Sequence, residues 1–260
     1  MVELGVIGGS GLYELAADAE RVLLDTPYGK PASAVSIGVL GGKEVAFMTR
    51  HGTDHAVPPH LVNYRANIWA LKELGVTTLV TSSVVGSLRA DYRPGHFVLV
   101  DQFYDRTTGR ASTFFEGPKV VHASLADPYC PALRAAARTA LEGLGEAFHP
   151  TGTAVVIQGP RFSTRAESQV YQTLGFSVLS MTQFPETALA REAAMCVVNI
   201  SFVSDLDAGV AGLQDEPVTA GLVWRTVRDA QPRIRRVLER TVELLEPNPG
   251  CACHGVLADI

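Results

Sequence analysis

An alternation of short β-rich runs with amphipathic helical segments is the feature that most constrains how this chain can fold. The expected strands cover residues 4–7, 35–40, 44–49, 78–82, 96–100, 153–158, 177–179 and 197–203. The expected helices cover residues 60–74, 130–144, 164–174, 185–194 and about 218–246. Strand–helix alternation of this kind predicts an α/β fold, in which helices flank a central, mixed and mostly buried β-sheet.

Local signals mark several helix ends. Gly75 and Gly175 stand just past expected helices, where glycine adopts a left-handed backbone without a steric cost. The sequence TRAE at residues 164–167 has the pattern of a capping box that opens a helix. In α/β folds, ligands collect where loops leave the carboxyl ends of the strands. The unusual polar residues of this chain lie in such loops.

The composition indicates one globular domain. With 47% hydrophobic residues among 260, the chain can bury a large core, and no linker, repeat or low-complexity tract divides it. We therefore expect one domain at residues 1–246 and a C-terminal tail at residues 247–260. The net charge of −5 gives no support to a nucleic-acid or membrane partner. Because the sequence shows no signal pattern and no bilayer-spanning stretch, the expected location is the cytoplasm.

The four cysteines form two groups. Cys130 and Cys196 lie in apolar surroundings, which is typical of inert core residues. Cys251 and Cys253 belong to the sequence CACHG, which could bind a metal or form a strained disulfide. The sequence offers no second ligand pair at zinc-finger spacing. We therefore expect no metal site, and a mobile tail without a function.

A glycine-rich loop, GVIGGSGL, follows the first expected strand. It lacks the third glycine of the dinucleotide-binding pattern G-x-G-x-x-G, and it does not match the P-loop pattern. Its backbone can still approach an anion closely, and the Ser10 hydroxyl adds a donor. The alternative is a tight turn that binds nothing.

A second loop, TRHGTDHAVPPH, also favours an anion. Arg50 offers a planar, permanently charged fork that suits phosphate, and the adjacent His51 can add a hydrogen bond. His51 and His55 have the spacing of metal ligands, but no third ligand can be nominated. Hydroxyl groups also stand at two other strand ends, in TSSVVGSL and SMT. Four such loops favour an oxyanion site over a surface pair of basic residues.

Two carboxylates, Asp205 and Asp207, follow the last expected strand in the sequence VVNISFVSDLDAG. Residues i and i+2 of a strand share a face, so these groups would stand side by side. In a desolvated pocket the two cannot both ionise comfortably, so one proton is shared and a pKa rises. The alternative is a solvated loop, or a cap ahead of the last helix.

Nine segments of the chain, taken in their order, are the basis of a resemblance to a known family. They are GVIGGSGL, TRHG, VNYRANIWALKELGV, GSL, DQFYDRTTGR, VVHASLADPYC, QGPRFSTRAES, SMTQFPETALARE and VSDLDAG. From about residue 3 to residue 230, this set resembles the 5′-methylthioadenosine phosphorylases, in the trimeric branch of the purine nucleoside phosphorylase family. The resemblance implies a single-domain, nucleoside phosphorylase-like fold, a homotrimer, and no metal or organic cofactor.

The resemblance also implies a reaction, in which inorganic phosphate as co-substrate displaces a purine from a 5′-modified nucleoside. From 5′-methylthioadenosine the products would be adenine and 5-methylthioribose 1-phosphate, in purine and methionine salvage. The implied phosphate contacts are Ser10, Arg50, His51, Ser83, Thr182 and the backbone of Val84. The implied base and sugar contacts are Phe162, Ser163, Met181, Asp205 and Asp207. The positions near the 5′ group are His55, His122 and Val218, some of them at a neighbouring subunit's site.

These residues suggest how both ends of the scissile bond are assisted. The phosphate contacts would hold the nucleophile beneath the anomeric carbon and place negative charge under a developing cation. Asp205, the expected catalytic residue, would give a proton to the ring nitrogen nearest the purine 6-position. The carboxylate pair would accept from a 6-amino group, whereas a 6-oxopurine would prefer Asn. Ser163 agrees, since 6-oxopurine relatives resemble GPxFET with Glu at that place.

Three alternatives stay open. The first is a purine nucleoside phosphorylase acting on 6-oxopurine nucleosides such as inosine, or a methylthioinosine phosphorylase; the carboxylate pair and Ser163 speak against it. The second is a nucleosidase, which uses water and would not need Arg50 and His51. The third is a non-catalytic nucleoside- or phosphate-binding protein, which leaves the two carboxylates unexplained.

Overall fold

The computed structural model describes residues 1–9, 19–118, 120–210, 218–247 and 249–257 of the chain. In this part of the chain, eleven strands form one mixed sheet. They are β1 (Leu4–Gly8), β2 (Glu20–Val22), β3 (Val35–Leu40), β4 (Lys43–Thr49), β5 (Thr78–Ser87), β6 (Phe97–Leu99), β7 (Gln102–Arg106), β8 (Phe148–His149), β9 (Thr153–Ile157), β10 (Val178–Ser180) and β11 (Cys196–Leu206). The order is β2-β3-β4-β1-β5-β10-β9-β7, while β11 pairs with β5 and continues the sheet to β6 and β8.

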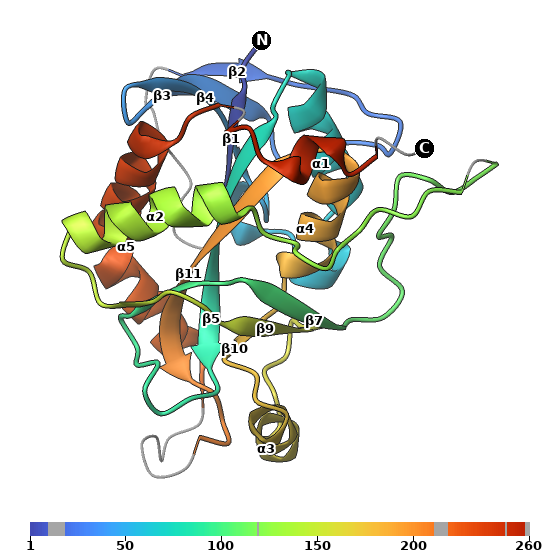
Figure 1. The fold of residues 1–260 in the computed structure, drawn as a ribbon. Helices are drawn as coiled ribbons and strands as arrows, with labels where there is room; N and C mark the ends of the chain where they lie inside the picture. The colour runs from blue at the N-terminus through green and yellow to red at the C-terminus, as the bar shows by residue number, and fades with distance from the viewer. Residues whose placement is uncertain (10–18, 119, 211–217, 248, 258–260) are drawn as a thin grey trace.

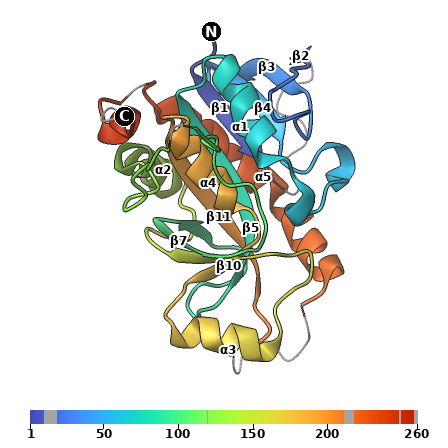
Figure 2. The same cartoon turned by 90° about the vertical axis from the view of Figure 1, so that its right-hand side faces the viewer.

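Helices cover both faces of the sheet (Figure 1). α1 (Tyr64–Glu73) and α4 (Gln183–Glu192) pack together on one face, as the turned view in Figure 2 shows. α2 (Pro131–Gly143) and α5 (Ala220–Leu244) pack together on the other face, and α3 (Arg165–Thr173) lies beyond one end of the sheet. The predicted α/β fold is therefore confirmed. Within the described ranges, no helix combines the length and the apolar character needed to cross a membrane.

Neighbouring residues of the central strands pack into two separate cores, one on each face of the sheet. Ile7 of β1 packs into the core that α1 and α4 share, whereas Val6 packs into the core that α2 and α5 share. Leu79 and Val80 of β5 divide between the two cores in the same way. Successive side chains of a strand point to opposite faces, so a sheet covered on both sides needs continuous apolar runs. This is the pattern that the sequence shows in its central strands.

The eight predicted strands are present, and two of them are longer than expected. β5 and β11 run parallel from the pair Thr78–Cys196 to the pair Ser87–Leu206. Because the two strands pair along their length, their polar second halves stay extended where hydrophobicity alone predicts a loop. The sequence analysis missed β2, β7 and β8, which are short and either exposed or only half-buried.

The five predicted helices are also present. At the start of α3, Thr164 and Glu167 form the expected capping box, each side chain accepting from the backbone N–H of the other residue. Gly75 and Gly175 follow α1 and α3 with φ angles of 98° and 80°. α1 begins at Tyr64, later than predicted, because the preceding residues form a separate 3₁₀ turn.

The C-terminal residues pack against the body of the protein. The short 3₁₀ helix η3 (Ala252–Gly255) includes Cys253, which is buried. His254 donates from Nδ1 to the carbonyl oxygen of Ala194 at 2.8 Å. The expectation of a mobile tail is therefore wrong for residues 249–257.

Candidate active site

A cavity of about 340 Å³ lies where the second half of β5 runs between β10 and β11. The strands β1, β4, β5 and β11 are mutually parallel through their pairings, so their carboxyl ends point to the same edge of the sheet. The loop after β4, the segment before α3 and the first turns of α5 complete the walls. The cavity therefore occupies the position at which α/β folds bind ligands.

Arg50 is a fully buried cation at one side of this cavity. Its Nε and Nη2 donate to the carboxylate of Glu186 at 2.6 and 2.7 Å, and its Nη1 donates to the carbonyl oxygen of Ser82 at 2.9 Å. Burial opposes the charge, but Glu186 more than offsets it, so the pKa of Arg50 is raised. A guanidinium has five N–H donors, so donors are left for an anion.

Gly9, at the end of β1, comes close to this guanidinium. A Cβ at residue 9 would lie 2.9 Å from Nη1 of Arg50 and 2.9 Å from the carbonyl oxygen of Ser82. No larger residue fits here unless the buried arginine or the β5 backbone moves. Gly9 therefore lets the end of β1 pack closely against Arg50, while the expected approach of the loop backbone to an anion stays a prediction.

His51 presents an acceptor rather than a positive charge. Its Nδ1 lies 2.9 Å from the carbonyl oxygen of Val57, which can only accept, so Nδ1 carries the proton. Burial, with the nearby charge of Arg50 and then His55, lowers the pKa of His51 to about 3. The ring is therefore neutral at pH 7, and its Nε2 can accept a hydrogen bond. Such a group suits the protonated oxygen of a hydrogen phosphate.

Ser83 and Thr182 add hydroxyl groups to the same region of the cavity. Ser201 donates to Oδ1 of Asn199 at 2.7 Å, and Nδ2 of Asn199 donates to Oγ of Ser83 at 3.0 Å. Because Ser83 accepts from an amide of fixed orientation, its own proton is available to a ligand. Thr182 is the N-cap of α4 but makes no side-chain capping hydrogen bond, so its hydroxyl is available too.

Asp205 is a buried acid in the extended end of β11, where the pairing with β5 shifts register between Val203 and Asp205. Ser204 donates to its Oδ1 at 2.5 Å, which leaves Oδ2 to hold a proton. Burial raises the pKa of Asp205 to about 6; the Ser204 hydrogen bond lowers it, and the charge of Asp207 adds to the rise. The expected raised pKa is present, but burial causes most of it and the neighbouring carboxylate has a smaller part.

Asp207 supplies an acceptor without a partner. Its side chain lines the cavity, and its buried Oδ2 makes no hydrogen bond with the described residues. Ser163 does not line the cavity, but its hydroxyl lies near enough to Asp207 to lower the pKa of that carboxyl. Burial raises the pKa of Asp207, and the hydroxyl of Ser168 counteracts part of this rise. A buried polar atom without a partner is costly, so the arrangement favours a ligand that brings a donor.

Apolar side chains form the remaining walls. Phe162 and Met181 line the cavity, and α5 contributes Val223 and Trp224. The rings of Trp224 and His55 pack in a T-shaped arrangement, with 5.0 Å between ring centroids. Ligand sites commonly combine such walls with a few polar groups that fix orientation. The cavity thus offers hydroxyl and guanidinium donors, a buried acid and flat apolar surfaces.

Comparison with known proteins places the chain in a family. The family model described as "Phosphorylase superfamily" matches residues 3–243. The chain belongs to this superfamily. An S-methyl-5′-thioadenosine phosphorylase of Thermofilum pendens is 47% identical over 258 residues, covering 98% of this chain and 97% of that protein. The protein of the same name from Pyrococcus abyssi is 45% identical, with 99% and 98% covered.

Solved structures of the superfamily agree. The methylthioadenosine phosphorylase of Schistosoma mansoni in complex with adenine matches this chain with a TM-score of 0.93 and 34% identity. The match covers 100% of this chain and 98% of that one. A point mutant of the adenosine/methylthioadenosine phosphorylase from the same organism, in complex with methylthioadenosine, matches with a TM-score of 0.92 and 33% identity, over 100% of this chain and 98% of that one. The single-domain fold and the phosphorylase resemblance are therefore confirmed.

Most of the predicted site residues of this superfamily member gather in the cavity. Those that line it are Arg50, His51, His55, Ser83, Val84, Phe162, Met181, Thr182, Asp205 and Asp207. Ser10 lies outside the described residues. His122 is exposed between β7 and α2 and does not line the cavity, so its role at a neighbouring subunit stays a prediction. Val218 does not line it either, whereas Ala220 and Val223 of the following helix do.

Sequence reasoning missed the residues that support this phosphorylase site from behind. Glu186 and Asn199 both act through another side chain, at separations of 136 and 116 residues from their partners. Neither stands in a motif with chemistry of its own, so no local signal singles it out. Trp224 was missed because a helix pattern does not tell which of its apolar residues faces a ligand.

Proposed function

We propose that this chain is a 5′-methylthioadenosine phosphorylase. In this reaction inorganic phosphate attacks the anomeric carbon, the bond from that carbon to the purine breaks, and adenine and 5-methylthioribose 1-phosphate leave. The observation that carries the proposal is a single cavity whose two ends differ in their chemical groups. One end has Arg50 with hydroxyl donors, and the other has the buried, protonatable Asp205 near Asp207, whose Oδ2 has no hydrogen-bond partner among the described residues.

At the phosphate end, the protein would bind and orient the nucleophile. Arg50 has N–H groups beyond those held by Glu186 and Ser82, and Ser83 has its proton available. His51 would accept the proton of a hydrogen phosphate through Nε2. Holding phosphate beneath the sugar removes much of the entropic cost of attack and places negative charge under the oxocarbenium-like transition state. Ser10 and the backbone of Val84 complete this proposed set.

At the purine end, Asp205 would act as general acid. With a pKa of about 6, a useful fraction of this carboxyl is protonated near neutral pH. Its Oδ2 would donate to the ring nitrogen nearest the 6-position as negative charge develops on the base. Proton transfer of this kind typically accelerates a reaction by roughly 10²–10⁴-fold.

The purine end also supports selection for adenine. The buried Oδ2 of Asp207 can only accept when ionised, and a 6-amino group only donates. A 6-oxo group is itself an acceptor, so its oxygen and Oδ2 of Asp207 would both be left without a hydrogen-bond partner. Ser163 is small enough to leave this edge open to the amino group. These features speak against inosine as the natural substrate.

The far end of the sugar would lie against α5. Val223 and Trp224 offer an apolar surface that suits a 5′-methylthio group better than a hydroxyl group, which needs a hydrogen-bond partner. His55, with its pKa lowered by burial and by Arg50, is a neutral neighbour of this surface. Val218, just ahead of the helix, does not line the cavity, so its part in binding the 5′ group stays a prediction.

The setting of the enzyme is part of the proposal. Phosphate is the co-substrate, and the proposed chemistry needs no metal or organic cofactor. A homotrimer would bring His122 of one subunit towards the site of another. A cytoplasmic enzyme of purine and methionine salvage, without nucleic-acid or membrane partners, fits these properties.

A substrate series tests the proposal. With saturating phosphate, kcat/KM should be highest for 5′-methylthioadenosine, lower for adenosine, and about 10²-fold or more lower for inosine and methylthioinosine. Equal rates for 6-oxo and 6-amino substrates would overturn the assignment of Asp205 and Asp207. Tight nucleoside binding with no base release would instead indicate a binding protein.

A further inference from the structure

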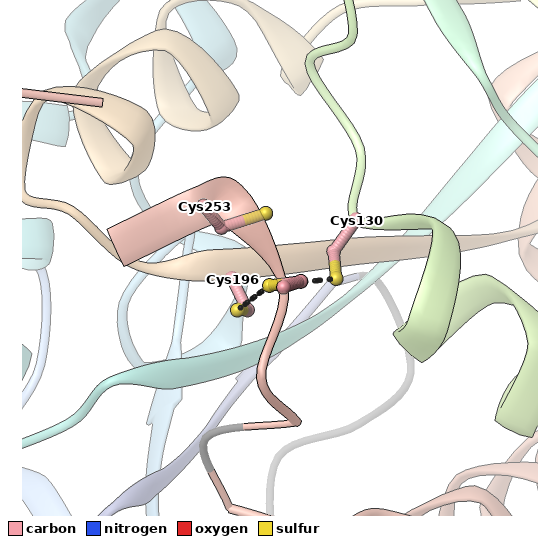
Figure 3. Close-up of side chains that lie close together, drawn as sticks. Cys130, Cys196 and Cys253 are labelled. Carbon is pink, nitrogen blue, oxygen red and sulfur yellow. Dashed lines mark hydrogen bonds between the residues drawn. The ribbon is translucent and has the colours of Figure 1, made fainter. Parts of the chain in front are cut away.

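All four cysteines of the chain meet at one point away from the cavity. Cys130 is the N-cap of α2, Cys196 is the first residue of β11, and Cys251 and Cys253 come from the tail. Their four Sγ atoms lie within 4.8 Å of one another. Two of the distances are 3.6 Å, from Cys130 to Cys251, and 3.1 Å, from Cys196 to Cys251. Figure 3 shows the labelled side chains of Cys130, Cys196 and Cys253 converging from three different elements.

We propose that this cluster binds a zinc ion through four thiolates. Zinc takes four sulfur ligands in a tetrahedron, and a Zn–S bond of about 2.3 Å puts neighbouring sulfurs about 3.8 Å apart. The cluster needs only small side-chain adjustments to reach that spacing, because its sulfurs already lie within 4.8 Å. The four thiols are free cysteines. A set of four soft sulfur ligands favours zinc over hard cations such as magnesium and calcium.

The backbone around the cluster is held in place. The N–H of Cys130 donates to the carbonyl of Val197, and the N–H of Cys196 donates to the carbonyl of Thr77, at 2.8 and 2.9 Å. Two ligands are therefore fixed by the sheet and by the start of α2. The C-x-C spacing supplies the other two from a single turn, η3. A preformed arrangement lowers the cost of ordering the ligands when an ion binds.

Polar side chains beside the cluster secure the tail. Arg191 donates from Nη1 to the carbonyl of Met195 at 3.2 Å and to that of Cys253 at 3.4 Å. His254 donates through Nδ1 to Ala194, and its Nε2 lies 3.4 Å from Sγ of Cys196. Ligating sulfurs commonly have such supporting groups around them. The guanidinium also offsets part of the −2 charge that four thiolates and one Zn²⁺ would leave.

One ligand stands where deprotonated sulfur is favoured. Cys130 is the N-cap of α2, and the helix dipole stabilises a thiolate at that position. Three of the cysteines are buried and Cys251 is partly exposed, which gives an ion a path to the cluster. On binding, each remaining thiol would release its proton to solvent.

The proposed role is structural, because the cluster lies far from the cavity. Asp205 stands nine residues after Cys196 in β11, which at about 3.3 Å per residue corresponds to roughly 30 Å. None of the cysteines lines the cavity. The ion would fasten the tail to the body of the protein. No metal site was expected because the sequence has no second ligand pair at zinc-finger spacing, whereas Cys130 and Cys196 meet only in the fold.

Metal analysis of the full chain, purified under reducing conditions, tests this proposal. We expect about one zinc per chain. Cobalt added to the zinc-free protein should give the visible spectrum of a tetrahedral tetrathiolate site. The double variant Cys251→Ser/Cys253→Ser should bind cobalt at least 100-fold more weakly and lose zinc. Ala252→Ser, between the two ligands, is the matched control and should bind like the unmodified chain. Removing zinc should lower the Tm of the unmodified chain but not that of the double variant.

Two results would overturn the proposal. One is a protein whose four thiols are shown to be reduced by intact-mass analysis, but which carries no zinc and shows no cobalt spectrum. The other is a double variant that retains zinc and cobalt binding. Adenine release is a separate readout, since the cluster is remote from the cavity. Full activity without metal uptake would overturn the zinc site alone, and metal uptake without activity would overturn the proposed function alone.

Discussion

The surroundings of Asp205, taken together, disfavour its ionised form. Burial is the main cause, and the net effect raises the pKa of this carboxyl from 3.8 to about 6. Between these two values the folded state binds more protons than the unfolded state, so the free energy of unfolding falls as pH rises through this range. Above about pH 6 the loss is complete. It amounts to about 3 kcal/mol, at 1.36 kcal/mol for each pKa unit.

The variant Asp205→Asn should therefore be more stable than the unmodified protein at neutral pH. The amide cannot ionise, so the destabilisation by a buried charge is removed. We expect the Tm of the variant to exceed that of the unmodified chain by several degrees at pH 8, and the difference to shrink towards pH 4. Calorimetry or thermal denaturation across this pH range measures it. A difference that does not vary with pH would contradict the raised pKa.

The same variant should be a poor enzyme. Without a proton donor for the leaving base, we expect kcat/KM for 5′-methylthioadenosine to fall by roughly 10²–10⁴-fold. Activity on inosine should fall much less, because an amide can donate to a 6-oxo group. Initial rates on both nucleosides, with phosphate saturating, give the ratio. Unchanged rates and an unchanged ratio would remove Asp205 from the leaving-group role.

At the scale of elements, the buried pair Arg50–Glu186 joins the loop after β4 to α4. The two side chains are 1% and 2% exposed, and their contact is bidentate. Such a pair holds the guanidinium in one orientation. Removing Glu186 would leave Arg50 as a buried cation without a counter-charge. This costs more free energy than the ion pair contributes to stability.

Glu186→Gln should lower the free energy of unfolding by about 3–5 kcal/mol, because Arg50 would lose its counter-charge. Phosphate should restore part of this stability by supplying a negative charge to the folded state. We therefore expect saturating phosphate to raise the Tm of the variant by more than it raises that of the unmodified protein.

Glu142→Gln is the matched control for this change. Glu142 pairs with Arg138 on the exposed face of α2 at 2.7 Å, and such pairs contribute about 0–1 kcal/mol. If Glu186→Gln proves no more harmful than this control, Arg50 does not depend on its buried partner. Equal phosphate effects in the variant and in the unmodified protein would mean that Arg50 does not meet phosphate.

For the whole molecule, most of the architecture could be predicted because local patterns and the final fold agree. Capping signals such as that at Thr164, and apolar runs on both faces of the sheet, mark elements that tertiary contacts then keep. The exceptions are the short strands β2, β7 and β8 and the polar ends of β5 and β11. The end of β11 stays extended by pairing with β5, which itself pairs with β10 on its other side, and no local pattern records these pairings.

The parts of the site that could not be predicted depend on contacts between distant residues. Arg50 was found because it stands beside His51 at the end of a predicted strand, and Asp205 because Asp207 follows it two residues later. Glu186 and Asn199 were not, since their role exists only once the fold brings them to a partner. The cysteine cluster has the same cause. Two of its members are in the core and two are in the tail, and they meet through the topology.

The most direct test of the central claim is release of adenine from 5′-methylthioadenosine with and without inorganic phosphate. The account predicts release only with phosphate, together with an equal amount of 5-methylthioribose 1-phosphate detected by phosphorus NMR. Release at the same rate in phosphate-free buffer, with free 5-methylthioribose as the product, would contradict it. The enzyme would then be a nucleosidase, and Arg50 and His51 would lose the role assigned to them.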